Sequence, residues 1–244
     1  MFTIFFTSTG KVKASGWGFK KNSEHQVPEI GKYQQIIEGT NSYYVGEKDS
    51  IYLTFDAGYD NGMLNEILDI LKDKNVKASF FVTGDFINRF PGLLQRMVNE
   101  NHIICNHSYS HKKITRLSKH NLEQDLKKLE DTYYNVTKQI MPKYFRPPEG
   151  DFDRRSLMNL KELGYTTFFW SIAYVDWKTD DQCGADYCVK TIMDNLHDGA
   201  IILMHSVSSS NKEALPVIID KIKEMGYNFK TVNQLPVEEK NPDN

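Results

Sequence analysis

Short apolar runs alternate with amphipathic segments along most of this chain. Seven of the runs have the length and composition of buried strands, and they cover residues 51–55, 78–82, 102–105, 144–145, 166–170, 200–204 and 228–232. Between most of them, apolar residues recur at the three- and four-residue spacing of a helix with one buried face. The clearest examples are Met63, Leu64, Ile67, Leu68 and Leu71, and then Leu122, Leu126, Leu129, Tyr133 and Val136.

This alternation predicts an α/β fold in which a parallel sheet is covered by helices. A distorted (β/α) barrel of about seven parallel strands is the arrangement that leaves the fewest strand edges exposed. Residues 1–48 show little periodicity, so we expect an N-terminal extension that packs on the core. The regular unit then covers residues 49–236, and residues 237–244 form a C-terminal tail.

Polar clusters follow five of the predicted strands. They are Asp56, the segment His107 to His111, the segment Arg146 to Gly150, the pair Asp176-Trp177, and His205. In parallel barrels, side chains just past the carboxyl ends of the strands converge on one face, where catalytic residues lie. Two histidines separated by three residues can turn onto one metal ion. The set is typical of a metal-assisted hydrolase.

Composition and charge narrow the classes of partner. The chain has 244 residues and a net charge of −2, and it contains no long basic run, so we expect no nucleic-acid partner. The apolar residues 1–6 are too short for a transmembrane helix or a complete signal peptide. They are either the end of a truncated export signal or an ordinary chain end. Cys183 and Cys188 either form a disulfide or remain free thiols.

Five motifs, in the same order, resemble those of the polysaccharide deacetylase family, also called the NodB-homology family or carbohydrate esterase family 4. The family motif T-F-D-D-G is matched by Thr54-Phe55-Asp56-Ala57-Gly58, H-[ST]-x-x-H by His107 to His111, R-x-P-x-G by Arg146 to Gly150, the fourth motif by Asp176-Trp177, and L-x-H by Leu203-Met204-His205. The resemblance implies a NodB-type barrel and a catalytic domain over residues 49–236.

Within the family, the chain is most similar to the sporulation δ-lactam-biosynthetic deacetylases. The similarity lies in Trp17-Gly18-Phe19-Lys20-Lys21, in the segment from Thr54 to Gly62, and in Val175-Asp176-Trp177-Lys178. It implies removal of acetyl groups from muramic acid residues of spore-cortex peptidoglycan. We therefore expect a monomeric enzyme of the cell envelope or spore wall whose export signal is absent or truncated in this chain.

The resemblance also assigns the catalytic residues. Asp56 corresponds to the general base, because a carboxylate beside an activated water can take its proton. Arg146 corresponds to the arginine that pairs with this carboxylate. His205 is the expected general acid that protonates the departing amine. Asp176 is expected to orient the His205 ring and to favour its charged form through a hydrogen bond.

Substrate-binding roles are implied for Phe55, Pro148, Glu149, Trp177 and Leu203. Trp177 and Leu203 are expected to wall a pocket for the acetyl methyl group, although ordinary packing would look identical in sequence. The backbone N–H of Glu149 is expected to stabilise the oxyanion.

The metal site departs from the family pattern. His107 and His111 match the metal-binding histidines, but Ala57 stands where the family has a ligating aspartate. We expect a divalent ion, zinc in the first instance, held by fewer protein ligands than usual. Asp60 is either a substitute ligand or the N-cap of the following helix.

The sequence thus predicts a de-N-acetylase of a cell-wall glycan, with muramic acid residues of peptidoglycan as the substrate. Two alternatives remain: a chitooligosaccharide or acetyl-xylan deacetylase, and a catalytically weak glycan-binding homologue. Muramic acid carries a lactyl carboxylate that chitin lacks. A cation near the pocket mouth would favour muramic acid, and Lys112, Lys113 and Lys178 are the candidates.

Overall fold

The computed structural model describes residues 15–236. The apolar residues 1–6 and the predicted tail 237–244 lie outside the described part of the chain. Within residues 15–236, no helix has the length and apolar composition needed to cross a membrane.

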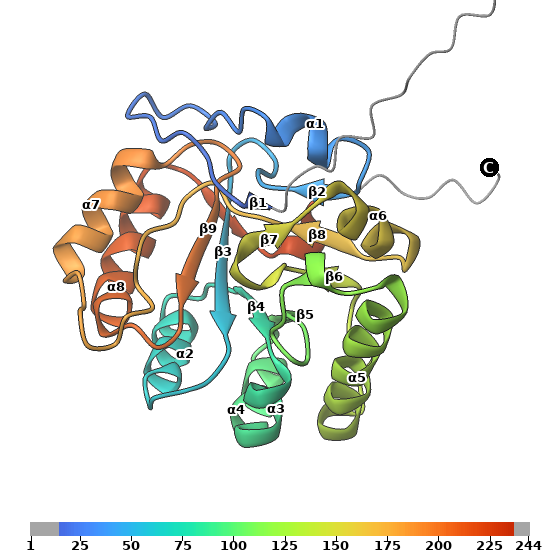
Figure 1. Ribbon diagram of the computed structural model, residues 1–244. Coiled ribbons are helices and arrows are strands. Elements are labelled where there is room, and N and C mark those ends of the chain that lie inside the picture. The colour runs from blue at the N-terminus through green and yellow to red at the C-terminus, as the bar shows by residue number, and fades with distance from the viewer. Residues whose placement is uncertain (1–14, 237–244) are drawn as a thin grey trace, which may run out of the picture.

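An eight-stranded parallel sheet forms the centre of the molecule (Figure 1). Its strands are β2 (Ser42–Tyr43), β3 (Ser50–Ala57), β4 (Ser79–Val82), β5 (Ile103–Asn106), β6 (Tyr144–Phe145), β8 (Thr166–Phe168), β9 (Ile201–His205) and β10 (Asn228–Lys230). The order is β10-β3-β4-β5-β6-β8-β2, and β9 also pairs with β3. A parallel bridge between Ile172 and Ile202 joins the segment after β8 to β9. The sheet therefore curls into the predicted distorted barrel.

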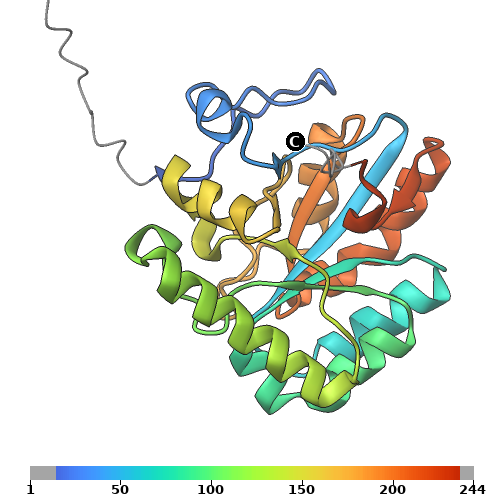
Figure 2. The same ribbon diagram turned by 90° about the vertical axis from the view of Figure 1, so that its right-hand side faces the viewer.

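Helices cover the outside of this sheet (Figures 1 and 2). They are α2 (Leu64–Asp73), α3 (Gly84–Arg89), α4 (Pro91–Asn99), α5 (Lys119–Thr137), α6 (Arg154–Glu162), α7 (Ala185–Asn195) and α8 (Ser209–Glu224). The buried face of α2 consists of Leu64, Ile67, Leu68 and Leu71, as the periodicity predicts.

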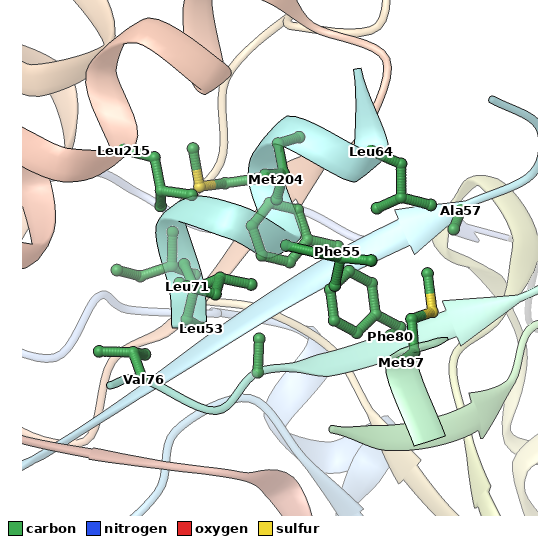
Figure 3. Close-up of a cluster of buried hydrophobic side chains, with 14 of the residues drawn as sticks. Leu53, Phe55, Ala57, Leu64, Leu71, Val76, Phe80, Met97, Met204 and Leu215 are labelled. Carbon is green, nitrogen blue, oxygen red and sulfur yellow. The ribbon is translucent and has the colours of Figure 1, made fainter. Parts of the chain in front are cut away.

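Alternation along β3 divides its side chains between two environments. Leu53, Phe55 and Ala57 face the helices and belong to a large apolar cluster, in which Phe55 stacks on Phe80 with ring centres 5.1 Å apart (Figure 3). Tyr52 belongs to a separate apolar cluster. Because successive strand residues point to opposite faces, Asp56 lies on the same face as Tyr52. The strand thus buries one face against helices and carries its carboxylate on the other.

The segment from residue 15 to 48 packs on this core. It contains β1 (Ser15–Gly16), which pairs antiparallel with β7 (Asp151–Phe152), the short helix α1 (Tyr33–Ile37), and β2, which extends the sheet beside β8. Trp17 stacks on Phe169 with ring centres 4.2 Å apart, and its backbone N–H donates to Gly150 O at 2.8 Å. The segment therefore supports the loop that follows β6.

Candidate active site

A cavity of about 710 Å³ brings together polar residues from several strand ends. Among its lining residues are Asp56, His107, His111, Glu149, Trp177, Leu203 and His205. Asp56 is the last but one residue of β3, His205 is the last residue of β9, and the two lie directly opposite each other in the β3–β9 register. Since residues opposite each other in a sheet point to the same face, the carboxylate and the imidazole share one side of the cavity.

Arg146 fixes the carboxylate of Asp56. Its guanidinium is fully buried, and Nη1 donates to Asp56 Oδ1 at 2.9 Å. Nε also donates to Phe168 O at 3.3 Å, and the guanidinium carbon lies 4.0 Å from the centre of the Phe81 ring. Burial raises the pKa of Asp56, but interactions with His107, with the charged and hydrogen-bonded Arg146 and with His205 outweigh burial and hold the pKa below its ordinary value. Asp56 is therefore ionised at neutral pH.

His205 has the opposite tendency. Asp176, in the segment after β8, accepts from His205 Nδ1 at 2.7 Å and from the His205 backbone N–H at 2.7 Å. Burial lowers the pKa of His205, but the hydrogen bond and charge of Asp176 raise it by more, so the pKa lies above its ordinary value. His205 therefore binds its second proton more firmly than an ordinary imidazole does, next to the ionised Asp56.

The two histidines of the second motif face each other, with ring centres 5.0 Å apart. His107 Nδ1 lies 2.9 Å from Arg146 O, and a carbonyl oxygen only accepts, so Nδ1 carries the proton. The other nitrogen, Nε2, is 3.5 Å from Asp56 Oδ2. Burial lowers the pKa of His107 to about 4. A neutral ring with a free Nε2 lone pair suits a metal ligand.

No third ligand joins this pair among residues 15–236, where no three His, Cys, Asp or Glu side chains converge on a common point. Ala57 offers no donor atom, and its methyl group is buried beside Leu64 (Figure 3). Asp60 Oδ1 accepts from the backbone N–H of Leu64, the first residue of α2, at 3.1 Å, although the N-cap residue itself is Met63. The residues present therefore fit a weak two-histidine cation site, with the remaining positions left to water or substrate.

Glu149 adopts an unusual backbone conformation in the short 3₁₀ turn Pro148–Gly150. Its φ of 56° lies in the left-handed region, which costs energy for a residue with a side chain. The side chain reaches out of the turn to Lys113, with Oε2 and Nζ 2.9 Å apart. Gly150, at φ +62°, has no room for a side chain, because a Cβ would lie 2.9 Å from Trp17 Cβ. The turn is thus held from both sides.

The walls of the cavity include three of the five expected substrate-binding residues, Glu149, Trp177 and Leu203, and lack the other two. Trp177 is half exposed, with its ring centre 5.6 Å from that of His205, and Leu203 lies on β9 within the wall. Phe55 and Pro148 are buried and do not line the cavity. The expectation that the Phe55 side chain contacts substrate is not supported, because strand alternation turns its ring toward the helices.

The three candidate lysines also lie outside the cavity wall. Lys113 is paired with Glu149, and Lys178 lies 3.5 Å from Asp181. Lys113 is the one that an ion pair connects to a lining residue. A substrate carboxylate would thus have to compete with Glu149 for it.

Two residues outside the five motifs, Asp125 and Asn211, hold the catalytic loops in place through hydrogen bonds. On α5, the carboxylate of Asp125 accepts from Ser108 Oγ at 2.7 Å, Tyr109 N at 2.8 Å and Ser110 N at 3.1 Å. It therefore clamps the loop between the two histidines.

On α8, Asn211 Nδ2 donates to Asp176 Oδ2 at 2.6 Å, and Asn211 Oδ1 accepts from Tyr174 Oη at 2.6 Å. The spacing Ser208-x-x-Asn211 indicates the start of a helix, because Ser208 Oγ accepts from Asn211 N. This spacing does not indicate that the Asn211 side-chain amide points toward Asp176.

Comparison with known proteins gives matches that agree with these observations. The family model for polysaccharide deacetylases matches residues 44–168. The chain is 41% identical over 225 residues to the peptidoglycan-N-acetylmuramic acid deacetylase PdaA of Bacillus subtilis, and the match covers 91% of this chain and 86% of that protein.

Two solved structures have a similar fold. The structure of Bacillus subtilis PdaA, a family 4 carbohydrate esterase, matches with a TM-score of 0.88 and 40% identity, covering 91% of this chain and 97% of that one. A family 4 carbohydrate esterase from Bacillus anthracis matches with a TM-score of 0.76 and 39% identity, covering 91% of this chain and 96% of that one.

Proposed function

Because the chain belongs to the polysaccharide deacetylase family, we propose that it hydrolyses the N-acetyl group of muramic acid residues in peptidoglycan. The relative from Bacillus subtilis is named for this reaction. The observation that carries the proposal is the pairing of Asp56 and His205 across β3 and β9, with one carboxylate and one proton-bearing imidazole facing the same cavity. Amide hydrolysis needs a base for the attacking water and an acid for the departing amine, and these two residues supply them.

Asp56 acts on the water. Its ionised carboxylate takes a proton from the water molecule that attacks the acetyl carbonyl carbon. Arg146 keeps this carboxylate charged and fixes one of its oxygens, so the second oxygen, Oδ2, is the one that faces the reaction. The developing negative charge on the carbonyl oxygen is stabilised by the backbone N–H of Glu149 in its held turn.

His205 acts on the amine. Its Nδ1 is engaged by Asp176, which leaves Nε2 to donate a proton to the sugar nitrogen as the C–N bond breaks. Asp176 also stabilises the positive charge of the ring until that transfer. Trp177 and Leu203 form the wall against which the acetyl methyl group packs.

Deacetylases of this family are metal-dependent. In this chain, His107 and His111 would hold the divalent ion, and zinc suits two imidazole ligands. A bound ion there supplies a positive charge that activates water and polarises the acetyl carbonyl. Because Ala57 occupies the position of the family's third metal ligand, we propose that this ion is held weakly.

The cellular location that we propose for the protein follows from its proposed substrate. Peptidoglycan lies outside the cytoplasmic membrane, so we propose that the protein works there, in the cell envelope or spore wall. Formation of a muramic δ-lactam requires both a free amine and a free lactyl carboxylate, and the proposed reaction supplies the amine.

A monomer is sufficient, because every residue invoked comes from a single chain.

The test is a substrate comparison. Purified protein is incubated with muropeptides, with peptide-free muramyl glycans, with chitin oligomers and with acetylated xylan, and the products are weighed by mass spectrometry. We expect loss of one acetyl group from muramic acid residues and no such loss in the Asp56→Asn variant. Deacetylation of chitin oligomers or xylan alone would reject muramic acid as the substrate.

A further inference from the structure

Two thiols lie against each other at the start of α7. Cys183 Sγ and Cys188 Sγ are 3.4 Å apart, and both cysteines are free. Gly184 is the N-cap of the helix, so Cys183 precedes the cap and Cys188 is the fourth helical residue. Side chains at these two positions commonly pack together and fix the angle at which the chain enters a helix. Here that contact is made by two sulfur atoms.

The thiol pair adjoins the segment that carries Asp176 and Trp177. Gln182, next to Cys183, donates to Asp176 O at 3.3 Å and accepts from Ser208 Oγ at 2.7 Å. On the other side, the buried Cys188 belongs to the same apolar cluster as Tyr174, whose hydroxyl donates to Asn211 Oδ1 at 2.6 Å. The pair is thus connected to the support of the site without lining the cavity.

We propose that Cys183 and Cys188 are an oxidation site that closes to an intramolecular disulfide. A disulfide bond is about 2.05 Å long, so the sulfur atoms need to approach by roughly 1.3 Å from their present 3.4 Å. The location proposed for the protein, in the cell envelope or spore wall, favours the disulfide, because disulfides persist outside the reducing cytoplasm.

The oxidant is a disulfide-bearing molecule. The thiolate of Cys183, which is partly exposed, attacks one sulfur of the oxidant and releases one thiol. The thiolate of the buried Cys188 then attacks Cys183 Sγ in the mixed disulfide and releases the second thiol. Two electrons and two protons pass to the oxidant, which leaves as two thiols. Cys105 takes no part, because it is buried on β5 inside the sheet.

The bond ties the end of the Asp176 segment to the first turns of α7. It closes a small ring, since the two cysteines are five positions apart. Cross-linking restricts the unfolded chain, so the midpoint of thermal unfolding should rise by about 5 °C. Deacetylase activity should be retained, because neither sulfur reaches the cavity.

Peptide mass spectrometry tests the proposal. Reduced protein is incubated with oxidised glutathione, and the remaining thiols are alkylated in denaturant before trypsin digestion. Cleavage after Lys178 and Lys190 places both cysteines on the peptide 179–190, whereas Cys105 falls on another peptide. We expect the peptide 179–190 to lack alkyl groups and to be lighter than its reduced form by two hydrogen atoms, with Cys105 alkylated. Alkylation of both Cys183 and Cys188, or a glutathione adduct that persists on Cys183, would overturn the proposal.

Two variants serve as controls. Cys188→Ser should stop at the glutathione adduct on Cys183, because the resolving thiol is gone. Cys183→Ser should leave Cys188 alkylated, and its unfolding midpoint should not respond to the oxidant. If the wild-type midpoint also fails to rise once the cross-linked peptide is present, the stabilising role is wrong.

Discussion

Single residues set the charges on which the proposed reaction depends. Asp56 and His205 lie side by side, yet Asp56 loses its proton more readily than usual and His205 keeps its proton more firmly. The difference comes from their partners, since Arg146 binds one and Asp176 binds the other. A base and an acid can therefore coexist at neutral pH, each favouring the charged form of its neighbour.

Removal of either group should abolish most of the activity. We expect Asp56→Asn and His205→Ala each to lower kcat by about 10²–10⁴-fold, because general acids and bases typically contribute that much. Asp85→Asn is a matched control, since Asp85 also lines the cavity but is paired with Arg89 at the surface. Circular dichroism should show an unchanged fold in all three. Near-wild-type rates in Asp56→Asn or His205→Ala would contradict the assigned roles.

Asp176 should control the pH dependence. In the wild type, activity should fall as the pH rises through the raised pKa of His205, because the ring then loses the proton it must donate. In Asp176→Asn, burial remains while the negative charge is lost, so the pKa of His205 falls and the alkaline loss of activity moves to lower pH. The pH profile of kcat/KM measures this shift, with the exposed Asp181→Asn as control. If the alkaline loss of activity stays at the same pH in Asp176→Asn, a group other than His205 titrates there.

At the scale of whole elements, helices position the catalytic loops. The loop between the two histidines has Ser108 and His111 at positive φ, a conformation that side-chain-bearing residues adopt rarely. Asp125 on α5 compensates with three hydrogen bonds to this loop. On α8, Asn211 orients Asp176 in a similar way.

Loss of the Asp125 clamp should affect both stability and metal binding. We expect Asp125→Ala to lower the free energy of unfolding by about 2 kcal/mol, since several hydrogen bonds to one charged group are removed. Zinc binding measured by calorimetry should weaken, because the two histidines are no longer held together. Asp131→Ala on the same helix removes only an exposed i,i+4 pair with Lys127 and should change stability by at most about 0.5 kcal/mol. Equal effects of the two substitutions would exclude a special role for Asp125.

These supporting residues show where sequence reasoning ends. The motif residues could be located in advance, because Asp56, Arg146 and His205 each follow an apolar strand and match a known motif. Asp125 and Asn211 sit in helices, where a polar side chain is ordinarily read as exposed. Only the curvature of the sheet and the packing of α5 and α8 bring them to the loops.

For the molecule as a whole, the order of strands and helices was predictable and some details were not. The seven predicted strands correspond to β3, β4, β5, β6, β8, β9 and β10. The prediction missed β1, β2 and β7, because a two-residue strand has no periodicity and is defined only by its partner. The Phe55 side chain does not line the cavity for a related reason: adjacent residues of a strand face opposite sides.

The fold should not depend on a metal ion. The apolar clusters that stabilise the barrel include neither His107 nor His111. Dialysis against a chelator should therefore remove bound zinc and leave the unfolding midpoint unchanged, whereas activity should fall and return when zinc is added. Elemental analysis together with thermal unfolding measures both. Stoichiometric zinc that survives the chelator would mean that a further ligand completes the site.

The pairing of β3 with β9 also determines when the protein becomes an enzyme. Thr54 on β3 donates to Ile202 O on β9 across a separation of 148 residues, so the strand bearing the base is synthesised well before the strand bearing the acid. Contacts of such long range form slowly, because the chain must lose much of its freedom before they stabilise it. No nascent chain that ends before β9 can therefore catalyse the proposed reaction. Activity begins only after β9 has been synthesised and has inserted beside β3.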